Sequence, residues 1–195
     1  MRSIVLLLLI LAPGLSRVIA QNPIPLKAGI LAEQISLPTF EDYGSRFGSG
    51  FSLGTQFSYK DKAKSALLQT ADFYFIYHKE YGTSIMLSSL FDYSIRPGKF
   101  HLDIKLGPGI MLFNHYTALY SQGDGGYQEA SGLQAKFFGM VSLSCSYPIG
   151  EIRPYLAYTT YVETPFISSY SALLPHQILE AGVYYNLRSK KNTNE

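Results

Sequence analysis

The chain has 195 residues, of which 47% are apolar and 15% are charged, and its formal net charge is +2 at pH 7. This small charge, without a basic run interleaved with stacking aromatics, excludes nucleic acid as an expected partner. The charged fraction lies below the roughly 25% of an average soluble domain, and 16 tyrosines and 17 glycines favour β structure. Cys145 is the single cysteine, so we expect no intrachain disulfide, no cysteine-based metal site and no cofactor.

The first twenty residues have the pattern of a secretory signal peptide. Arg2 precedes an apolar run, and Val18 and Ala20 stand at the small-residue positions before a cut. Cleavage after Ala20 would make Gln21 the first residue of the mature chain. We therefore predict a signal peptide over residues 1–20, a barrel domain over residues 21–188 and a polar tail over residues 189–195.

Beyond this segment the chain alternates between apolar and polar residues in short stretches that turn residues separate. No run of about 18 apolar residues follows, so we expect no transmembrane helix. A period of two predicts strands, and eight such stretches cover residues 26–34, 50–59, 70–78, 83–95, 100–112, 133–147, 152–162 and 179–187. An even number of strands, each near the roughly 9–11 residues that cross a bilayer at a tilt, predicts an all-β, antiparallel up-and-down transmembrane barrel.

The connections between these strands differ in length. They are short at residues 60–64, 79–82, 96–99 and 148–151, and long at residues 36–47, 114–132 and 163–177. Short turns in the periplasm and long loops outside the cell are typical of outer-membrane barrels. We expect the long connections to be exposed loops, with a flexible one around Asp124 and with His115 solvated.

Charge keeps to one face of each predicted strand. The charged or titratable residues on these polar faces are Lys27, Glu33, Asp72, Asp92, His101, Asp103, Lys105, Lys136, Arg153 and Glu180. The opposite faces carry no Asp, Glu, Lys or Arg, as hydrocarbon requires, because Arg or Lys at the bilayer midplane costs roughly 2–4 kcal/mol. We therefore expect the apolar faces to meet lipid and the ten polar residues to form an ion-pair lattice, with a structural role, inside a narrow barrel.

Tyrosines near the strand ends support this orientation. Tyr59, Tyr77, Tyr93, Tyr147 and Tyr185 fall on the apolar faces, close to a boundary. A tyrosine ring at the membrane interface can lie among headgroups with its hydroxyl in water. We interpret these five residues as an interfacial girdle.

With its export signal and hairpin rhythm, the chain resembles the small eight-stranded outer-membrane β-barrels, the porin-like and OmpA-like barrels of Gram-negative bacteria. The resemblance covers residues 26–187 and includes the stretch Leu106-Gly107-Pro108-Gly109 and the final strand from Gly182 to Leu187. It implies residence in the outer membrane among lipid and lipopolysaccharide, and recognition of the last strand by the barrel-assembly machinery. The sequence departs from the family pattern because a polar tail from Arg188 follows, where an aromatic residue usually ends the chain.

Fold does not fix function in this family. A structural, adhesive or membrane-integrity role, with the long loops contacting an unidentified extracellular ligand, is the leading hypothesis. The alternatives are a narrow pore for small solutes, a lipid A-modifying enzyme and a soluble periplasmic ligand-binding barrel. Some family members are lipid A deacylases, and the segment Asn114-His115-Tyr116-Thr117 matches their His-x-Ser-Asn pattern only at the histidine. We therefore expect no enzymatic activity.

Overall fold

The structure is a computed structural model that describes residues 24–35, 47–79, 81–116, 119–123, 126–130, 132–164 and 174–186. Those ranges contain eleven β-strands: β1 Pro25–Gln34, β2 Gly48–Asp61, β3 Ser65–His78, β4 Gly82–Ser88, β5 Phe91–Ile95, β6 His101–His115, β7 Leu119–Gly123, β8 Gly126–Ala130, β9 Leu133–Ser146, β10 Ile152–Thr164 and β11 Leu174–Asn186. The signal peptide and its cut at Ala20 and Gln21, the tail after Asn186, and Asp124 lie outside the described residues.

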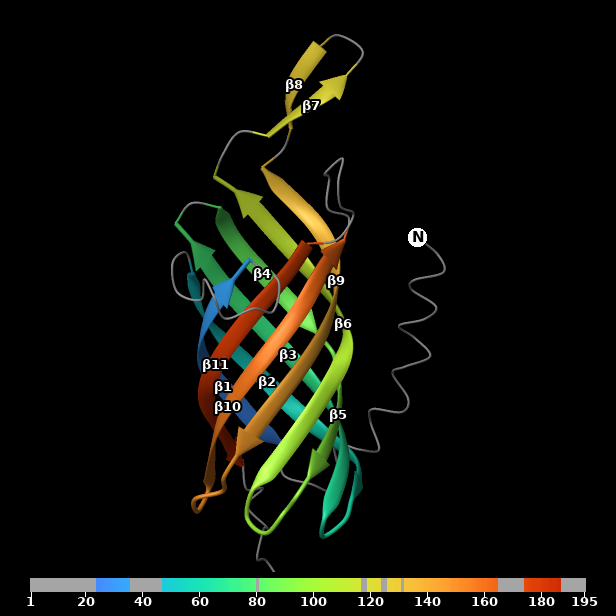
Figure 1. The fold of residues 1–195 in the computed structure, drawn as a ribbon, viewed down its shortest axis with the longest axis vertical. Coiled ribbons are helices and arrows are strands. Elements are labelled where there is room, and N and C mark those ends of the chain that lie inside the picture. The colour runs from blue at the N-terminus through green and yellow to red at the C-terminus, as the bar shows by residue number, and fades with distance from the viewer. Residues whose placement is uncertain are drawn as a thin grey trace, which may run out of the picture.

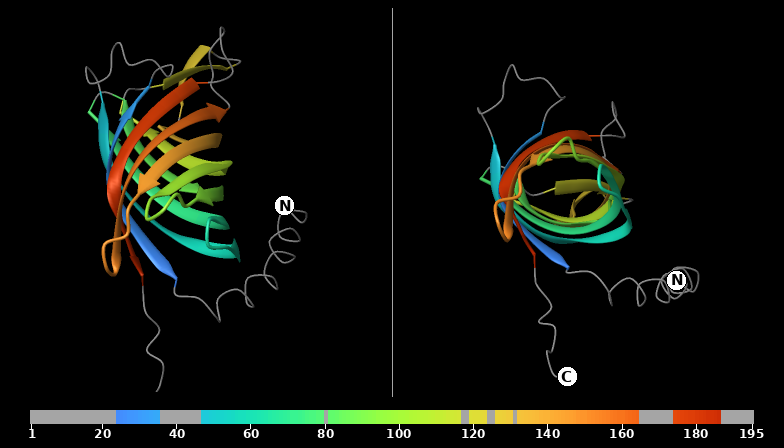
Figure 2. Two further views of the ribbon diagram at one scale, coloured as in Figure 1. Left: turned by 60° about the horizontal axis from the view of Figure 1, so that its bottom comes forward. Right: turned by 90° about the horizontal axis from the view of Figure 1, so that it is seen from below.

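Nine of these strands form one closed antiparallel barrel. We call each strand position around the ring a stave; there are eight, because β4 and β5 together occupy one position. Each of these two strands pairs with β3 on one side and with β6 on the other. Strand β1 pairs over its whole length with β11, from Pro25 opposite Asn186 to Gln34 opposite Gln177, and this pairing closes the ring. Figure 2 shows the ring from below, and Figure 1 shows the strands inclined to the long axis.

Proline explains the break between β4 and β5. Pro108 of β6 has no N–H to donate, so the ladder is interrupted on the side of that residue that faces the broken stave. Its carbonyl accepts a hydrogen bond from the amide of Ser89 at 3.1 Å, while the carbonyl of Leu90 bonds the amide of Thr70 at 2.8 Å. The stave continues after this irregularity, and all eight predicted strands are present in the barrel.

Two of the predicted long loops are shorter than expected. Strand β10 continues to Thr164 and β11 begins at Leu174, so residues 163, 164 and 174–177 belong to the barrel wall. Strand β6 continues to His115, which is half-buried at the end of that strand, so its prediction as a solvated loop residue is wrong. Both differences have one cause. Inward and outward residues continue to alternate in β6, β10 and β11 beyond the limits that the apolar–polar pattern of the sequence predicts.

The connection between β6 and β9 contains a small hairpin of its own. Strands β7 and β8 pair from Leu119 opposite Ala130 to Gly123 opposite Gly126, and they form a separate two-stranded sheet. This part of the predicted flexible loop is therefore a β-hairpin, and it projects beyond the end of the barrel that carries the long connections (Figure 1).

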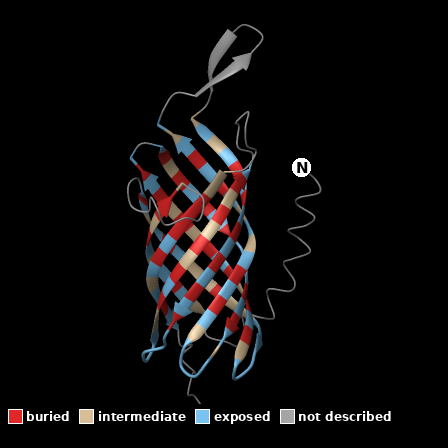
Figure 3. Ribbon diagram, viewed as in Figure 1, coloured by how far each residue is buried: buried red, intermediate tan, exposed pale blue. Residues whose placement is uncertain are grey.

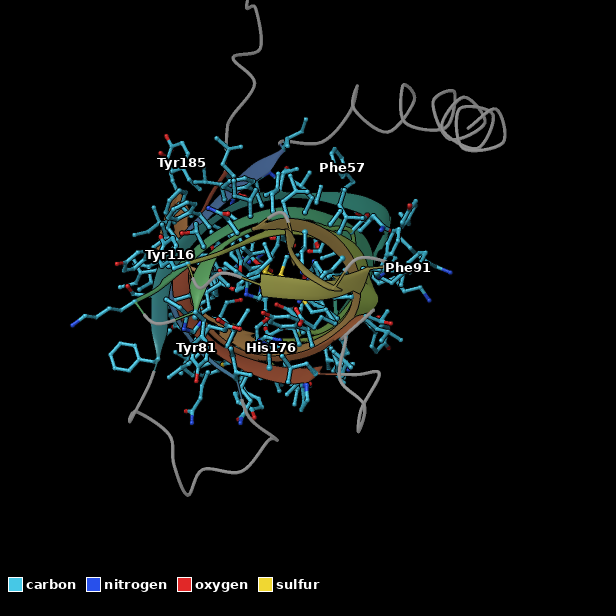
Figure 4. The ribbon with its side chains drawn as sticks, turned by 90° about the horizontal axis from the view of Figure 1, so that it is seen from above. Phe57, Tyr81, Phe91, Tyr116, His176 and Tyr185 are labelled. Carbon is cyan, nitrogen blue, oxygen red and sulfur yellow. The ribbon has the colours of Figure 1, made fainter. Side chains whose placement is uncertain are left out.

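Burial alternates along most of each barrel strand, which gives the chequered wall of Figure 3. On the outside, Ile30 is 73% exposed and Leu106 is 61% exposed. The outer wall also carries Phe57, Phe91 and Tyr185, which Figure 4 labels around the ring. Within the eight described staves, the exposed charged side chains are Lys60 and Asp61, at the short-turn end of β2.

The five tyrosines that the sequence places in an interfacial girdle all lie on the outer wall. Their exposed fractions run from 36% for Tyr147 to 57% for Tyr59. The part of the chain that the structure describes has no helix that is long and apolar enough to span a bilayer.

Candidate functional site in the barrel interior

The largest group of interior charges surrounds Lys27 on β1. Its ammonium nitrogen lies 3.0 Å from Oδ1 of Asp72 on β3 and 2.9 Å from Oε1 of Glu180 on β11. The hydroxyls of Ser52 and Tyr155 donate hydrogen bonds to the same Glu180 oxygen. Three strands thus bring one cation between two carboxylates, and two neutral donors complete the coordination of Glu180.

Tyr155 reaches Glu180 because glycines open the wall beside it. Gly29 and Gly182 face each other across β1 and β11, and a Cβ added to either would meet the Tyr155 hydroxyl. A larger residue at these positions would displace the tyrosine from the carboxylate, so the glycines serve packing inside the barrel.

A second group lies nearer the short turns and continues from the first through Tyr184. Lys105 donates to the Tyr184 hydroxyl at 2.9 Å and lies 3.8 Å from Oδ2 of Asp92. Gln56 donates to the same Asp92 oxygen at 3.1 Å and accepts from Arg153 at 2.8 Å.

The remaining members of this second group are Arg153, His101, Asp103 and Ser144. Arg153 also contacts Nδ1 of His101 at 2.9 Å, and its guanidinium lies 4.4 Å from the centre of the Tyr184 ring. Asp103 accepts from the hydroxyl of Ser144 at 3.1 Å. We call the two connected groups the lower lattice, whose members are Lys27, Ser52, Gln56, Asp72, Asp92, His101, Asp103, Lys105, Ser144, Arg153, Tyr155, Glu180 and Tyr184.

The third group lies at the opposite end of the interior, below the long connections, and it contains histidines. Glu33 accepts hydrogen bonds from the Tyr161 hydroxyl at 2.7 Å and lies 2.5 Å from Nδ1 of His176. It also contacts the ring of His78. Figure 4 looks into this end of the barrel and labels His176.

This third group extends across β10 to β9. Glu163 lies 3.6 Å from Nε2 of His176, and it accepts a hydrogen bond from Lys136 at 2.8 Å. The rings of Tyr161 and His176 stack with their centres 4.3 Å apart. We call these residues the upper cluster: Glu33, His78, Lys136, Tyr161, Glu163 and His176.

The ten candidate residues from the sequence therefore separate into two groups. Glu33 and Lys136 belong to the upper cluster, and the other eight belong to the lower lattice. All ten are buried except His101 and Arg153, which are half-buried. Their proposed role, to neutralise the interior by pairing, stays a prediction of the sequence.

Sequence reasoning missed three residues that complete the upper cluster: His78, Glu163 and His176. His78 lies on a predicted inward face but is not one of the ten candidates. Glu163 and His176 fall in the predicted loop over residues 163–177. Extending the alternation by one further inward position on β10 after Tyr161, and by two on β11 before Glu180, places both residues inside the barrel.

An apolar layer separates the lower lattice from the upper cluster. On β1, Leu31 lies between Lys27 and Glu33, and on β3, Ile76 lies between Asp72 and His78. The same order holds on β11, where Ile178 lies between His176 and Glu180, and on β9, where Phe138 and Met140 lie between Lys136 and Ser142. The apolar layer consists of Leu31, Ile76, Met86, Met111, Phe138, Met140 and Ile178, which belong to one buried cluster.

The layer contains every methionine of the chain other than Met1. Met86 and Met111 are paired across β4 and β6, and the exposed fractions of Met86, Met111 and Met140 are 0%, 1% and 1%. Unbranched thioether side chains fill irregular gaps well. Packed apolar side chains therefore occupy this level of the interior.

The interior has few means for chemistry. Among the described residues no group of three or more His, Cys, Asp or Glu side chains is placed to hold a metal ion. All four histidines are described, and their side-chain partners are carboxylates, Arg153, Gln134 and aromatic rings rather than hydroxyls. Cys145 lies on the outer wall. The described residues thus contain no serine–histidine or cysteine–histidine pair.

A closed antiparallel barrel is a transmembrane β-barrel when its outer wall is apolar, with exposed charge only at the short-turn end of β2, and its interior carries paired charges. Closed barrels are the form in which strands can span lipid, because every backbone group is paired within the ring. The protein is a small eight-stranded barrel of the outer membrane.

Comparison with known proteins gives likenesses of structure only. No protein-family model matches the sequence, and no curated protein matches it either. The crystal structure of Ail, the attachment invasion locus protein of Yersinia pestis, is 11% identical, with a TM-score of 0.48, and covers 85% of this chain and 99% of Ail. The N-terminal barrel domain of Pseudomonas aeruginosa OprF is 9% identical, with a TM-score of 0.46, and the match covers 86% of this chain and 100% of that domain.

The outer-membrane enzyme PagL is also similar, at 13% identity and a TM-score of 0.47, with 80% of this chain and 97% of PagL covered. These three neighbours include an attachment protein and an enzyme by their names. At such identities and TM-scores the likenesses assign no function to this chain.

Proposed function

We propose that the protein is a closed, non-conducting barrel that anchors in the outer membrane and presents its long connections outside the cell for structural or adhesive contact. The observation that carries this proposal is the apolar layer across the interior. A pore requires a continuous water path, and packed apolar side chains exclude water. This argues against the pore hypothesis, although both ends of the interior are polar.

The end of the barrel that carries the long connections supports a role in extracellular contact rather than in transport. The β7–β8 hairpin extends beyond the barrel end, where β6 and β9 hold its base (Figure 1). By the usual orientation of such barrels, short turns face the periplasm and long connections face outward. Lipopolysaccharide would surround this end, and an extracellular ligand of the connections would meet the hairpin first. Recognition of β11 by the barrel-assembly machinery remains part of the same proposal.

The enzyme hypothesis has no support from the side chains. A lipid A-modifying hydrolase requires an activated nucleophile, and the histidines of the described residues bond carboxylates, a guanidinium or an amide. The upper cluster instead resembles a packed ionic network, because Glu33 accepts from three side chains at once.

Solute flux tests the closed interior. Purified protein is reconstituted into liposomes, and swelling is measured in a small neutral sugar. We expect no swelling above protein-free liposomes. A variant with Met86, Met111 and Met140 all changed to serine should swell, provided that heat-modifiable mobility shows it to be folded. Swelling with the unmodified protein would overturn the closed-barrel proposal.

The proposed extracellular contact is tested separately by removing the β7–β8 hairpin. Residues 117–131 are replaced by a short Gly-Ser linker, and cells expressing either protein are compared for autoaggregation and for attachment to immobilised glycosaminoglycan and matrix proteins. The barrel of the shortened variant should still be heat-modifiable, and attachment should fall to that of cells without the protein. Equal behaviour of both strains, without attachment, would contradict an adhesive role and leave the structural one.

A further inference from the structure

The outer wall has a shallow apolar groove that runs across several strands. The groove has a volume of about 460 Å³, and its lining includes Ile95, Leu102, Leu143, Cys145, Leu156 and Leu179, which come from β5, β6, β9, β10 and β11. Cys145 is outward-facing, and its small side chain lies between the leucines and contributes to the hollow.

The groove starts at the short-turn end and rises to the middle of the wall. Ile95 is the last residue of β5, and it pairs with Leu102 near the start of β6. At the other end, Leu179 lies near the middle of β11, seven residues before the strand ends at Asn186. Four interstrand steps of about 4.8 Å give a length of roughly 19 Å. A diagonal of that length is comparable with the roughly 15 Å of hydrocarbon in one leaflet, half of a core of about 30 Å.

The rim where the groove begins is basic. Its exposed cations are Lys60, Lys62 and Lys64 in the β2–β3 turn region and Lys99 in the β5–β6 turn. Arg96 joins the two turns, because its amide bonds the carbonyl of Lys64 at 2.9 Å and its side chain pairs with Asp61 at 2.6 Å.

Arg96 directly follows Ile95, so the cations and the mouth of the groove are adjacent in the chain. A basic rim at the mouth of an apolar groove is complementary to a molecule with an anionic head and a hydrocarbon tail. Basic residues beside a bilayer attract anionic lipids.

We propose that this groove and rim bind an anionic glycerophospholipid of the periplasmic leaflet, with one acyl chain in the groove and the phosphate group against Lys64 and Lys99. The choice of leaflet rests on the orientation in the proposed function, with the short turns in the periplasm; lipopolysaccharide then occupies the opposite leaflet and does not meet this rim. The site is separate from the barrel interior and does not depend on whether the interior conducts.

The test compares phosphatidylglycerol with phosphatidylethanolamine. The protein is placed in nanodiscs with equal parts of the two lipids, released into the gas phase, and the lipids that remain bound are counted by native mass spectrometry. We expect retention of phosphatidylglycerol over phosphatidylethanolamine. Each lysine near the headgroup should contribute about fivefold, so Lys64→Gln with Lys99→Gln should abolish the preference. The matched control, Lys79→Gln, removes an exposed lysine at the opposite end of the barrel and should leave the preference unchanged.

A second pair of variants tests the groove. Cys145→Phe fills it and should lower retention of the bound lipid severalfold. Gly139→Phe adds the same ring to the same strand at an outward position with open space and outside the groove lining, and retention should be unchanged. Heat-modifiable mobility establishes that all variants are folded.

Three results would overturn the proposal. The first is equal retention of both lipids by the unmodified protein. The second is an equal loss in the Lys79→Gln control or in the Gly139→Phe control. The third is lipopolysaccharide in place of phospholipid on protein purified from native outer membranes.

Discussion

The two polar ends of the barrel interior handle charge by different side chains. The lower lattice combines lysine and arginine with aspartate and glutamate. The upper cluster has one such pair, Lys136 with Glu163, and surrounds Glu33 with two histidines and a tyrosine. A buried lysine keeps a fixed charge that needs its partners, but a histidine can be neutral at physiological pH and still donate a hydrogen bond. The comparison teaches that Lys27 is a fixed charge between two carboxylates, whereas the central Glu33 of the upper cluster is held by three side chains that can donate hydrogen bonds.

The largest effect should follow from breaking the lower lattice. Lys27→Met removes the cation between Asp72 and Glu180 and leaves two buried carboxylates without it. We expect the free energy of unfolding to fall by about 3–5 kcal/mol, because an uncompensated buried charge is costly. Urea titration in lipid vesicles, followed by heat-modifiable mobility, measures the loss. The control Lys79→Met, at an exposed position, should change little, and a loss below about 1 kcal/mol for Lys27→Met would contradict the lattice.

The apolar layer that keeps the two ends apart should be nearly as sensitive. Met111→Ala leaves a cavity beside Met86, and we expect a loss of about 2–5 kcal/mol in the same titration. Met111→Leu keeps the volume and should cost less than about 1.5 kcal/mol. Equal losses for alanine and leucine would show that the position is not packed as described.

The upper cluster should tolerate loss of its central charge better than the lower lattice does. Glu33→Gln keeps an acceptor for Tyr161 and leaves the pair between Lys136 and Glu163 in place, so we expect a loss of about 1–3 kcal/mol. Tyr161→Phe, which removes one donor and keeps the ring stacked on His176, provides the matched comparison. If Glu33→Gln destabilised the barrel more than Lys27→Met, the contrast between the two ends would be wrong.

The smallest effect should come from an ion pair outside the interior. Arg96 pairs with Asp61 at 2.6 Å, and the Asp61 side chain is 55% exposed. An exposed pair contributes about 0–1 kcal/mol, so Arg96→Gln should lower the free energy of unfolding by no more than that. The same titration at high salt should reduce the difference further, and a loss comparable with that of Lys27→Met would contradict the distinction between rim and interior.

Much of the barrel follows from the sequence because one physical rule governs each strand. Lipid outside requires a charge-free face, and the alternation therefore identifies the inward positions of Lys27, Asp72, Lys105 and Glu180. The partners could not be predicted in this way, because pairing depends on strand register, and period two leaves register open. The structure gives the register, in which Lys27 lies opposite Tyr184 on β11 and opposite Gly54 on β2.

The strand ends and the apolar layer were harder to predict for different reasons. Alternation does not mark where a strand leaves the membrane, so the sequence predicts a loop at Glu163 and His176. The layer was missed because Met86, Met111 and Ile76 fall on faces that also carry charges. Only the order of residues along several strands shows that these apolar positions meet at one level.

Access of water to the apolar layer tests the central claim most directly. In a Cys145→Ser background, Met111→Cys places a thiol in the layer and His101→Cys places one at the half-buried short-turn end of the interior. The rate of reaction with a charged, water-soluble maleimide is measured on folded protein in detergent. We predict rapid labelling of His101→Cys and labelling of Met111→Cys only after boiling. Equal rates in the folded barrel would show that water passes through the layer, and would contradict the closed interior.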